Sequence, residues 1–311
     1  MKKLIPAAVL MTLAGAAQAQ VTMYGLVDMS YGKNEITFPG QKDDVFSGGD
    51  NGSSQGNSTT RVGIKGSSDV GSGVKANFQF ETNGITSNGD VPAPFFNRAA
   101  WAGFSGSFGE IRVGKQDSVA FQTMAGFDLN GASNSNAAGM NALVAPWLRG
   151  RQDRSVQYIS PVAGGFKVQV GFQPEGQVAG AKSNGSIGVS YSGGPLGAAV
   201  VMESARNAGD KDFYSVGGTY DLGVVKLALG YADGGTGFKG TTIGAVAPIA
   251  GLNVGFQLAK NSDTNAMATE IFVNKEIFKN TYAYAEVANL DKTANGFTKG
   301  DNYAIGFIYV F

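Results

Sequence analysis

The chain has 311 residues, 43% of them hydrophobic, and equal numbers of basic and acidic side chains, 24 of each. Beyond the N-terminus no stretch approaches the roughly 20 apolar residues that a spanning helix needs, which excludes a helical membrane bundle. It contains no cysteine and no histidine. This excludes disulfides, thiolate or imidazole metal sites, a Ser-His-Asp triad and the ordinary proton shuttle near neutral pH, so we expect no enzyme, no metal and no other cofactor.

The N-terminus predicts an export signal. Two lysines, Lys2 and Lys3, precede an apolar run over residues 4–15, and Ala17-Gln18-Ala19 supplies a small-residue cleavage site. We predict that residues 1–19 are a cleaved signal peptide; an uncleaved anchor is the alternative, but the apolar run is short for that role. Cleavage removes two of the 24 basic residues and leaves a net charge of −2. That balance gives no support to nucleic-acid binding.

Period-two alternation starts directly after the predicted signal. Met23 and Val27 share one face of the first segment, while Tyr24 and Asp28 share the other, as in a strand with one apolar and one polar face. Residues 58–67 and 73–83 repeat the pattern. Periodicity alone fits either a soluble sandwich with its apolar face in the core or a membrane barrel with that face in lipid.

Three further features favour the membrane barrel. The alternation continues evenly to the last residue, without a linker, and the predicted signal directs the chain out of the cytoplasm. Tight joints such as Gly194-Pro195 alternate with wide ones such as residues 34–56, which is typical of short periplasmic turns and long extracellular loops. Aromatic residues also lie near the strand ends, as in the girdles of such barrels: Tyr31, Phe95, Phe96, Tyr158, Tyr231, Tyr303, Tyr309 and Phe311.

We therefore predict an all-β fold in which residues 20–311 form a 16-stranded antiparallel transmembrane β-barrel. An even number of strands places both termini on one side. The strands are expected to begin near Val21, Ser58, Gly73, Phe95, Gly109, Gly150, Phe166, Gly185, Leu196, Asp212, Val224, Lys239, Leu252, Met267, Thr281 and Gly300. Strand sixteen should pair with strand one, because lipid cannot satisfy the polar groups of an open edge.

The third long connection, residues 115–150, differs from the others. It shows no sustained alternation, and loops of this length are usually functional or disordered. Phe127, Leu143 and Trp147 could anchor it against another surface. We expect it to fold inward and narrow the lumen, since a barrel of this size otherwise encloses a broad aqueous channel. An outward surface loop is the alternative.

Six sequence motifs carry a resemblance to a known family. They are Val21-Thr22-Met23-Tyr24-Gly25, Arg61-Val62-Gly63-Ile64-Lys65-Gly66, Asn97-Arg98-Ala99-Ala100-Trp101-Ala102-Gly103-Phe104, Phe108-Gly109-Glu110-Ile111-Arg112-Val113-Gly114-Lys115-Gln116, Ser155-Val156-Gln157-Tyr158-Ile159-Ser160-Pro161, and the ending Gly306-x-x-Tyr309-x-Phe311. In this order they resemble the general diffusion porins of the Gram-negative outer membrane, of the betaproteobacterial type. The resemblance covers essentially the whole mature chain.

That resemblance implies a homotrimer whose third loop forms a constriction in each lumen. The family's basic wall corresponds to Arg61 and Arg98, with Arg151 a looser match, and Asp128 falls where the loop carries an acid facing that wall. The Pro-Glu-Phe-Gly-Gly element of the enterobacterial branch is absent, and asparagines occupy the region. We therefore predict a weak anion preference. The arginines suit the wall because a guanidinium stays charged at physiological pH.

Strand parity predicts further charges in the lumen. They are Lys65, Arg112, Glu110, Glu81 and Asp28. For Lys65, Arg112 and Glu110 we favour ordinary ion pairs without a selective role. The terminal aromatics, Tyr309 and Phe311, resemble the signal by which outer-membrane barrels are recognised for insertion.

Lys115 falls on the lipid-facing parity, where a cation needs a partner. In the family a loop from an adjacent subunit latches near this point; here that loop would contain Asp90. A Lys115–Asp90 subunit contact and simple snorkelling of Lys115 to the interface are both open. Small residues expected to face outward and to suit barrel packing are Gly25, Gly63, Ala76 and Gly103.

The predicted function is passive diffusion of small hydrophilic solutes and ions through a water-filled channel in the bacterial outer membrane, reached through the periplasm. A substrate-preferring porin and a surface adhesin built on the same barrel are the alternatives, and an outer-membrane hydrolase is opposed by the missing histidines. The expected partners are two further copies of the chain, outer-membrane lipid and lipopolysaccharide, the barrel-assembly machinery and the solutes, but no nucleic acid.

Overall fold

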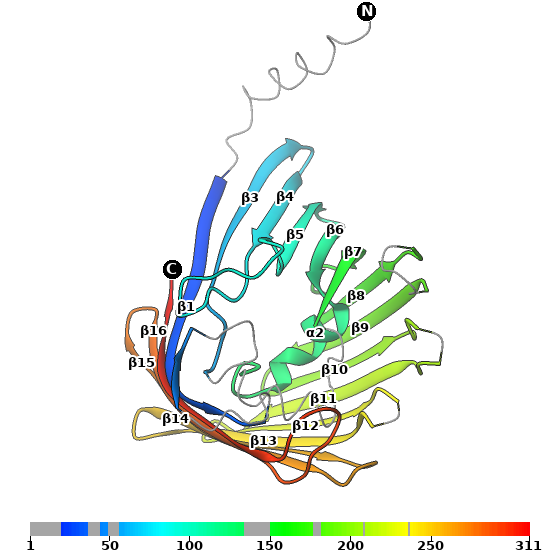
Figure 1. Ribbon diagram of the computed structural model, residues 1–311. Coiled ribbons are helices and arrows are strands. Elements are labelled where there is room, and N and C mark those ends of the chain that lie inside the picture. The colour runs from blue at the N-terminus through cyan, green and yellow to red at the C-terminus, as the bar shows by residue number, and fades with distance from the viewer. Residues whose placement is uncertain are drawn as a thin grey trace, which may run out of the picture.

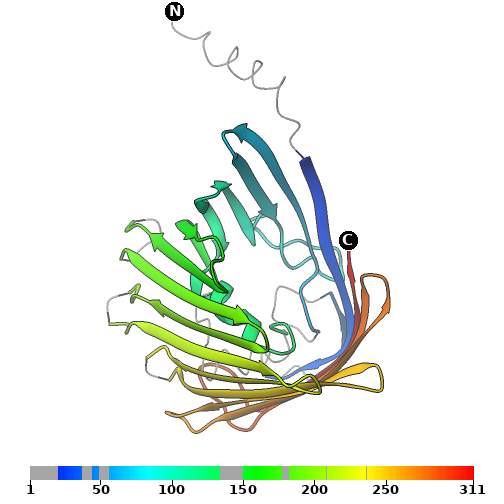
Figure 2. The same ribbon diagram turned by 180° about the vertical axis from the view of Figure 1, so that it is seen from behind.

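Sixteen long strands close into one antiparallel barrel (Figures 1 and 2). The computed structural model describes residues 20–36, 44–48, 56–133, 150–176, 182–207, 209–235 and 237–311, so the predicted signal peptide lies outside the described residues. The barrel closes where β1 (Gln20–Asn34) pairs with β17 (Gly300–Val310), from Leu26 opposite Val310 to Asn34 opposite Asn302. The prediction of a closed 16-stranded barrel is confirmed.

The other barrel strands follow in sequence order around the ring. They are β3 (Arg61–Gly71), β4 (Val74–Glu81), β5 (Ala99–Gly106), β6 (Gly109–Asp117), β7 (Arg151–Ile159), β8 (Phe166–Gln173), β9 (Asn184–Gly193), β10 (Leu196–Glu203), β11 (Phe213–Asp221), β12 (Lys226–Asp233), β13 (Lys239–Ile249), β14 (Leu252–Asn261), β15 (Met267–Phe278) and β16 (Thr281–Leu290). The largest difference from a predicted start is at β5, expected near Phe95. There Asn97 bonds to the backbone of Asn83 and holds the segment before Ala99 in the loop.

The two ends of the barrel differ in their connections. At one end tight turns close the hairpins, with Gly193 opposite Leu196 and Ile249 opposite Leu252. At the other end residues 82–98 and 118–150 separate successive strands. Short turns mark the periplasmic end and long loops the extracellular end of a bacterial barrel. In the part of the chain that is described, no helix is long and apolar enough to cross a membrane.

A short additional strand lies inside the first long loop, where the sequence analysis expects none. This strand, β2 (Val45–Ser47), pairs with β1 from Ser30 opposite Ser47 to Gly32 opposite Val45. The ladder between β1 and β3 ends at Leu26 opposite Arg61, so the extracellular half of β1 would otherwise lack a partner on that side. The loop therefore covers an exposed edge.

The wall is apolar outside and polar inside. On β8, Val170 and Phe172 are 42% and 48% exposed, whereas the alternating Gln169 and Gln173 are only 2% exposed. Glutamines are indeed among the largest fully buried side chains of the described residues. This reverses the pattern of a soluble sandwich and fits apolar side chains that face lipid around a polar lumen.

The described part of the third loop packs against the lumenal side of this wall. Helix α2 (Val119–Met124) begins at Ser118, whose Oγ accepts a hydrogen bond from Phe121 N, and continues into the single turn η3 (Ala125–Phe127). Lumenal glycines leave room for it: a Cβ at Gly188 of β9 would lie 2.2 Å from Thr123 Oγ1. Figures 1 and 2 show α2 within the ring of strands. Leu143 and Trp147 lie outside the described residues.

Two of the small residues expected outside face inward. A Cβ at Gly63 would lie 2.6 Å from the ring of Tyr24, which points into the lumen. Gly103 shares the parity of Trp101, whose indole bonds to the lumenal Gln79, so it is lumenal as well. Gly25 and Ala76 keep the outward parity. The expectation for Gly63 and Gly103 was wrong because it did not follow the alternation of their own strands.

Candidate functional site

Three arginines lie at the extracellular ends of alternate strands on one side of the barrel. Arg61 opens β3, Arg98 directly precedes β5 and Arg151 opens β7. Arg61 lies within the electrostatic reach of both Arg98 and Arg151. We call these three residues the arginine group. Because a guanidinium does not lose its proton at physiological pH, their mutual repulsion has to be offset by neighbouring groups.

Two carboxylates offset part of this charge. Arg98 forms an ion pair through Nε with Glu81 Oε1 and donates from Nη1 to Asn83 Oδ1 at 3.2 Å. Arg151 Nε lies 3.3 Å from Asp117 Oδ1, and these two residues are opposite each other on β7 and β6. The sequence analysis missed Asp117, although its position at the end of a strand with lumenal charges was a usable signal.

Arg61 is bonded differently from the other two arginines. Its Nη1 donates to Ser58 Oγ and to the Thr59 carbonyl, both at 3.2 Å. Within the described ranges it forms no ion pair. Two members of the arginine group are therefore ion-paired, with Glu81 and Asp117, whereas Arg61 interacts with the buried Asp28 only at longer range.

Two members of the arginine group, Arg61 and Arg98, line a cavity of about 340 Å³ in the wall of the lumen. Its lining combines charge with aromatic and amide surface: Tyr24, Arg61, Gln79, Glu81, Arg98, Trp101, Arg112, Gln116, Asp117 and Gln122. The guanidinium of Arg112 lies 4.4 Å from the centre of the Trp101 ring, and Trp101 Nε1 donates to Gln79 Oε1 at 3.2 Å. These contacts hold flat, polar side chains in fixed orientations along the wall.

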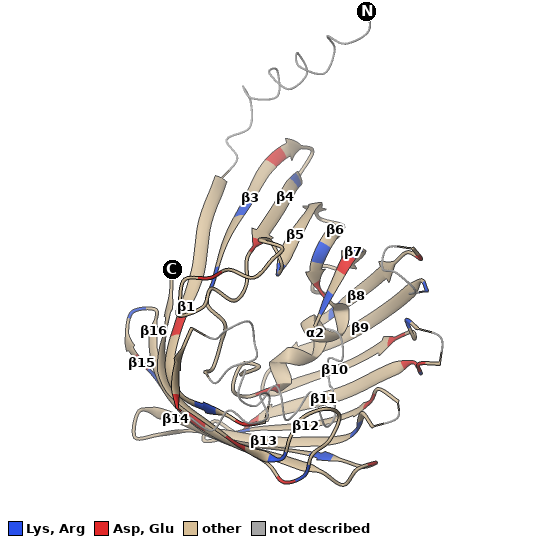
Figure 3. Ribbon diagram, viewed as in Figure 1, with Lys and Arg blue, Asp and Glu red and all other residues tan. Residues whose placement is uncertain are grey.

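The remaining predicted lumenal cations are bound locally. Arg112 Nη2 lies 2.7 Å from Glu110 Oε2, and Lys65 Nζ is 5.0 Å from the centre of the Tyr24 ring. Tyr24 in turn donates to Glu81 Oε2 at 2.6 Å. Basic segments thus follow β3 to β7 along one side of the lumen (Figure 3).

Asp128 does not stand as an exposed acid facing the arginines. It is 5% exposed, and its Oδ1 accepts hydrogen bonds from Gln257 Nε2 at 3.0 Å and from the backbone of Asn130 at 2.9 Å. Gln257 belongs to β14, on a part of the wall that carries none of the arginine group. The structure thus places Asp128 against β14, where its hydrogen bond to Gln257 joins the third loop to the wall, and its expected place opposite the arginines stays a prediction.

Asp128 belongs to a group of four buried carboxylates, which we call the acidic seam: Asp28, Asp128, Glu270 and Glu286. Asn130 joins two of them, because its Nδ2 donates to Glu270 Oε1 at 2.7 Å and to Glu286 Oε2 at 2.8 Å. Ser133 Oγ lies 2.9 Å from both oxygens of Glu286. The seam therefore fastens the end of the described part of the third loop to β15 and β16.

The same seam fastens the first loop. Asp28, which is completely buried, accepts from Tyr284 OH at 2.7 Å and from the Ser58 backbone at 2.5 Å. Asn57 Nδ2 donates to Glu286 Oε2 at 3.2 Å and to Asn130 Oδ1 at 3.1 Å, which links the two loops. Sequence reasoning found Asp28 but missed Glu270 and Glu286, although both acids fall on the lumenal parity. In the described ranges no cluster of acids has the geometry of a metal site.

Lys115 has an acidic partner in its own chain. It lies where the ladder between β6 and β7 shifts register, and its Nζ pairs with Asp153 Oδ1 on β7. Asp90 lies in the second long loop, where its backbone N–H donates to Thr86 Oγ1 at 3.0 Å. The predicted Lys115–Asp90 contact joins two subunits and stays a prediction.

The terminal aromatics lie where β17 meets β1 and the barrel closes. The rings of Tyr309 and Phe311 stack with centres 6.0 Å apart, and both are exposed on the outside. Phe311 N donates to Gly25 O at 3.1 Å, and Gly25 N donates to Phe311 O at 3.0 Å. The last residue thus extends the ladder to the first strand.

A closed barrel with an apolar exterior, a charged lumen and a loop packed inside it defines a channel protein of the outer membrane. Residues 7–295 match the family of Gram-negative porins. The chain belongs to this family, and it is accordingly an outer-membrane channel for the diffusion of small solutes.

Individual relatives agree with this assignment. An outer-membrane porin protein of Bordetella pertussis is 30% identical over 294 residues, covering 79% of this chain and 74% of that protein. Outer-membrane porin protein 32 of Delftia acidovorans is 29% identical over 344 residues, covering 98% and 95%. Among solved structures, an anion-selective porin from Comamonas acidovorans superposes with a TM-score of 0.73 at 24% identity, covering 94% of this chain and all of that one.

Proposed function

We propose that this porin favours anions weakly, with the arginine group as the selective element. The observation that carries the proposal is that three arginines lie within electrostatic reach of one another and that only two of them, Arg98 and Arg151, form ion pairs in the described residues. The four carboxylates of the acidic seam are at most 5% exposed and are bonded to neutral donors, so a passing ion has little direct contact with them. A low-dielectric wall strengthens the effect of each remaining lumenal charge. The structural relative from Comamonas is described as anion-selective.

Reversal potentials under a KCl gradient test this preference. Replacing the two arginines on β3 and before β5, Arg61→Gln with Arg98→Gln, should move the reversal potential toward cation preference, because two positive charges are lost while Glu81 stays. Lys65→Gln is the matched control: it removes one lumenal charge held over the Tyr24 ring, away from the arginine group. A cation-preferring wild type, or an equal shift in the control, contradicts the proposal.

We infer that the solutes are small hydrophilic molecules in general rather than one preferred substrate. The described lumenal wall carries single aromatics bonded to neighbours, such as Trp101 to Gln79, instead of a continuous aromatic track. Single-channel recording with added sugars or dicarboxylates tests this: saturable block by one solute class would favour the substrate-preferring alternative. An absence of open steps would favour the adhesin.

We propose that three copies assemble and that Lys115 lies close to the second loop of a neighbouring subunit. Asp153, its in-chain partner, has a side chain 53% exposed, so the pair could accept a further polar contact from that loop. Outward-facing Gly25 and Ala76 would allow close packing of barrels. Cross-linking in mild detergent that returned only monomers would contradict the trimer.

We also propose cleavage of the predicted signal peptide and recognition of Tyr309 and Phe311 during insertion. Cleavage after Ala19 would leave Gln20 as the first residue, at the start of β1, and N-terminal sequencing of the outer-membrane form checks it. Tyr309 and Phe311 would be read by the barrel-assembly machinery. Phe311→Ala should therefore reduce insertion in cells more than it reduces folding into detergent in vitro.

A further inference from the structure

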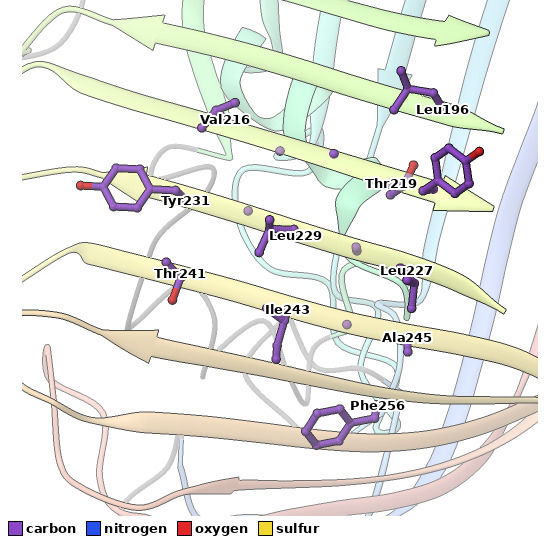
Figure 4. Close-up of a pocket in the computed structure, with 16 residues that line it drawn as sticks. Leu196, Val216, Thr219, Leu227, Leu229, Tyr231, Thr241, Ile243, Ala245 and Phe256 are labelled. Carbon is purple, nitrogen blue, oxygen red and sulfur yellow. The ribbon is translucent and has the colours of Figure 1, made fainter. Parts of the chain in front are cut away.

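The two faces of the wall differ in what they can act on. Outward side chains are mainly apolar, as in the groove on β10 to β14, where Val216, Leu229 and Ile243 are exposed (Figure 4). A side chain that influences a passing ion therefore has to act from the lumenal face. Tyr284 of β16 lies on the lumenal face, and β17 and β1 separate its strand from β3, which carries Arg61.

Tyr284 reaches across the line where the barrel closes. In the register of the ladders it lies beside Gly306 of β17, which in turn lies beside Ser30 of β1. A Cβ at Gly306 would lie 2.7 Å from Tyr284 OH, so the tyrosine ring lies over a residue that has no side chain. Its hydroxyl donates to Asp28 Oδ1 on β1 at 2.7 Å. This contact from β16 to β1 requires the closed barrel.

The same hydroxyl holds the end of the first loop. Tyr284 OH accepts a hydrogen bond from Asn57 N at 3.0 Å. Ser58 N donates to Asp28 Oδ2 at 2.5 Å, so the tyrosine and the aspartate together bind two successive backbone N–H groups. Gly56 has a φ of 106°, and a Cβ there would lie 3.2 Å from Tyr284 OH, which shows how closely the loop approaches the ring. These contacts fix the course of the backbone at this point.

That backbone leads directly into Arg61 and supplies its hydrogen-bond acceptors. Arg61 Nη1 donates to Ser58 Oγ and to the Thr59 carbonyl, both at 3.2 Å. The ladder between β1 and β3 ends where Leu26 lies opposite Arg61, so residues 57–60 lie outside it. Among the described residues Arg61 forms no ion pair. The position of its guanidinium therefore depends on the side chains that hold residues 57–60.

We propose that Tyr284 is a positioning residue for the ion selectivity of the pore. Directly at Asn57 and through Asp28, it holds the segment that binds the guanidinium of Arg61. Tyr284 is itself only 5% exposed, so it acts through Arg61 rather than by contact with ions. The effect of a charge on a passing ion falls with distance, so a guanidinium that can turn away from the lumen weakens the anion preference. The inference rests on the proposed role of the arginine group.

Reversal potentials under a KCl gradient test this role in Tyr284→Phe, in Arg61→Gln and in the double variant. Tyr284→Phe removes the donor to Asp28 and the acceptor for Asn57 N but keeps the ring. It should move the reversal potential toward cation preference, in the same direction as Arg61→Gln and by a smaller amount. The double variant should match Arg61→Gln alone, because without the guanidinium there is nothing for Tyr284 to position. Shifts that add in the double variant overturn the inference.

The two single variants separate this inference from the proposed function. A shift in Arg61→Gln without a shift in Tyr284→Phe overturns the positioning role and leaves the arginine group as the selective element. The absence of a shift in Arg61→Gln contradicts the selective role of Arg61, and the positioning role fails with it. Stable open-channel steps, recorded in the same bilayers, verify that each variant is folded.

Gly56→Ala is an independent second variant. It keeps the tyrosine hydroxyl but adds a Cβ at a backbone position that favours glycine, 3.2 Å from Tyr284 OH, and so displaces the segment. Its reversal potential should move in the same direction as that of Tyr284→Phe. Tyr282→Phe is the matched control, because it removes a hydroxyl from the same strand where the side chain is 38% exposed. An equal shift in Tyr282→Phe and Tyr284→Phe, or no shift in Gly56→Ala, overturns the positioning role.

Discussion

The arginine group and the acidic seam each bring like charges together in the lumen. The arginines are compensated partly by ion pairs, whereas the carboxylates are compensated by hydrogen bonds from neutral groups. Only two of the arginines form ion pairs in the described residues, and both keep part of their surface open, with the Arg98 and Arg151 side chains 19% and 28% exposed. The carboxylates of the seam are almost completely buried and bonded to amides and hydroxyls. An arginine without an ion pair leaves an electric field in the water of the pore. Hydrogen bonds from neutral donors instead let the buried carboxylates hold the loops in place.

The difference divides the work of the pore between its two sides. Under the proposed ion preference, the arginine group acts on passing ions, whereas the acidic seam bonds the first and third loops to the wall. Substitutions on the seam should therefore alter conductance and stability, and substitutions in the arginine group should alter selectivity. The following experiments test whether the two walls have these separate roles, and the variant with the strongest expected effect comes first.

Gly188→Val should disturb the third loop most. Its Cβ would lie 2.2 Å from Thr123 Oγ1 and 3.0 Å from Val119, so α2 must shift toward the water. We expect a clear fall in single-channel conductance and a loss of about 1–3 kcal/mol from overpacking. Gly185→Val, three residues away on the outer face of the same strand, is the control. Equal conductance in the two variants would show that α2 is not held against β9.

Asn130→Ala should loosen the loop without adding volume. Glu270 and Glu286 each lose a donor from Asn130 Nδ2, and a buried charged group left without its donor costs about 1–3 kcal/mol or more. Noisier open-channel current and a lower melting temperature are the expected results, with little change in reversal potential. Asn253→Ala removes an exposed amide bond to Asn274 and should leave both quantities unchanged. If Asn130→Ala changed ion selectivity as much as the arginine variants do, the two walls would not have separate roles.

Ionic strength should act on the arginine group alone. The screening length falls from about 30 Å at 0.01 M to about 3 Å at 1 M salt. The anion preference should decline steadily over that range, while conductance noise, which reflects the hydrogen-bonded seam, should not. A preference that persists at 1 M would assign selectivity to pore width instead of charge.

Lys115→Ala should have the smallest effect on the isolated barrel. An exposed ion pair such as Lys115–Asp153 contributes about 0–1 kcal/mol. A double-mutant cycle with Asp153→Ala, read by thermal unfolding and by subunit dissociation in detergent, separates the pair from a subunit contact. Dissociation that follows Lys115→Ala but not Asp153→Ala supports the neighbouring loop; an equal response to both limits Lys115 to its own chain.

The strands of this fold are predictable because their signal is local. Alternation with period two places Tyr24 and Asp28 on one face whatever the rest of the chain does, and the predicted start of β10 at Leu196 is the observed one. Where a side chain holds the backbone out of the ladder, as Asn97 does before β5, the predicted start of the strand differs from the observed one. The short strand β2 was not predicted, because it pairs with the part of β1 that extends beyond the ladder with β3, and that extension is not visible in the sequence of β2.

The site is predictable only in part, since its key contacts join residues far apart in the sequence. Arg61 and Arg98 could be placed by parity and motif together. The motif that marks Asp128 does not encode its partner, and Gln257 lies 129 positions further on. The acids that hold the loop, Glu270 and Glu286, occupy strands whose own sequences give no sign of meeting Asn130.

The ladder between Leu26 and Val310 has a consequence for biogenesis. The two strands that seal the cylinder, β1 and β17, are the first and the last barrel strands in sequence order, so the cylinder cannot close until both are in place. A chain inserted without β17 would present the unpaired edges of β1 and β16 to hydrocarbon, which cannot satisfy their backbone polar groups.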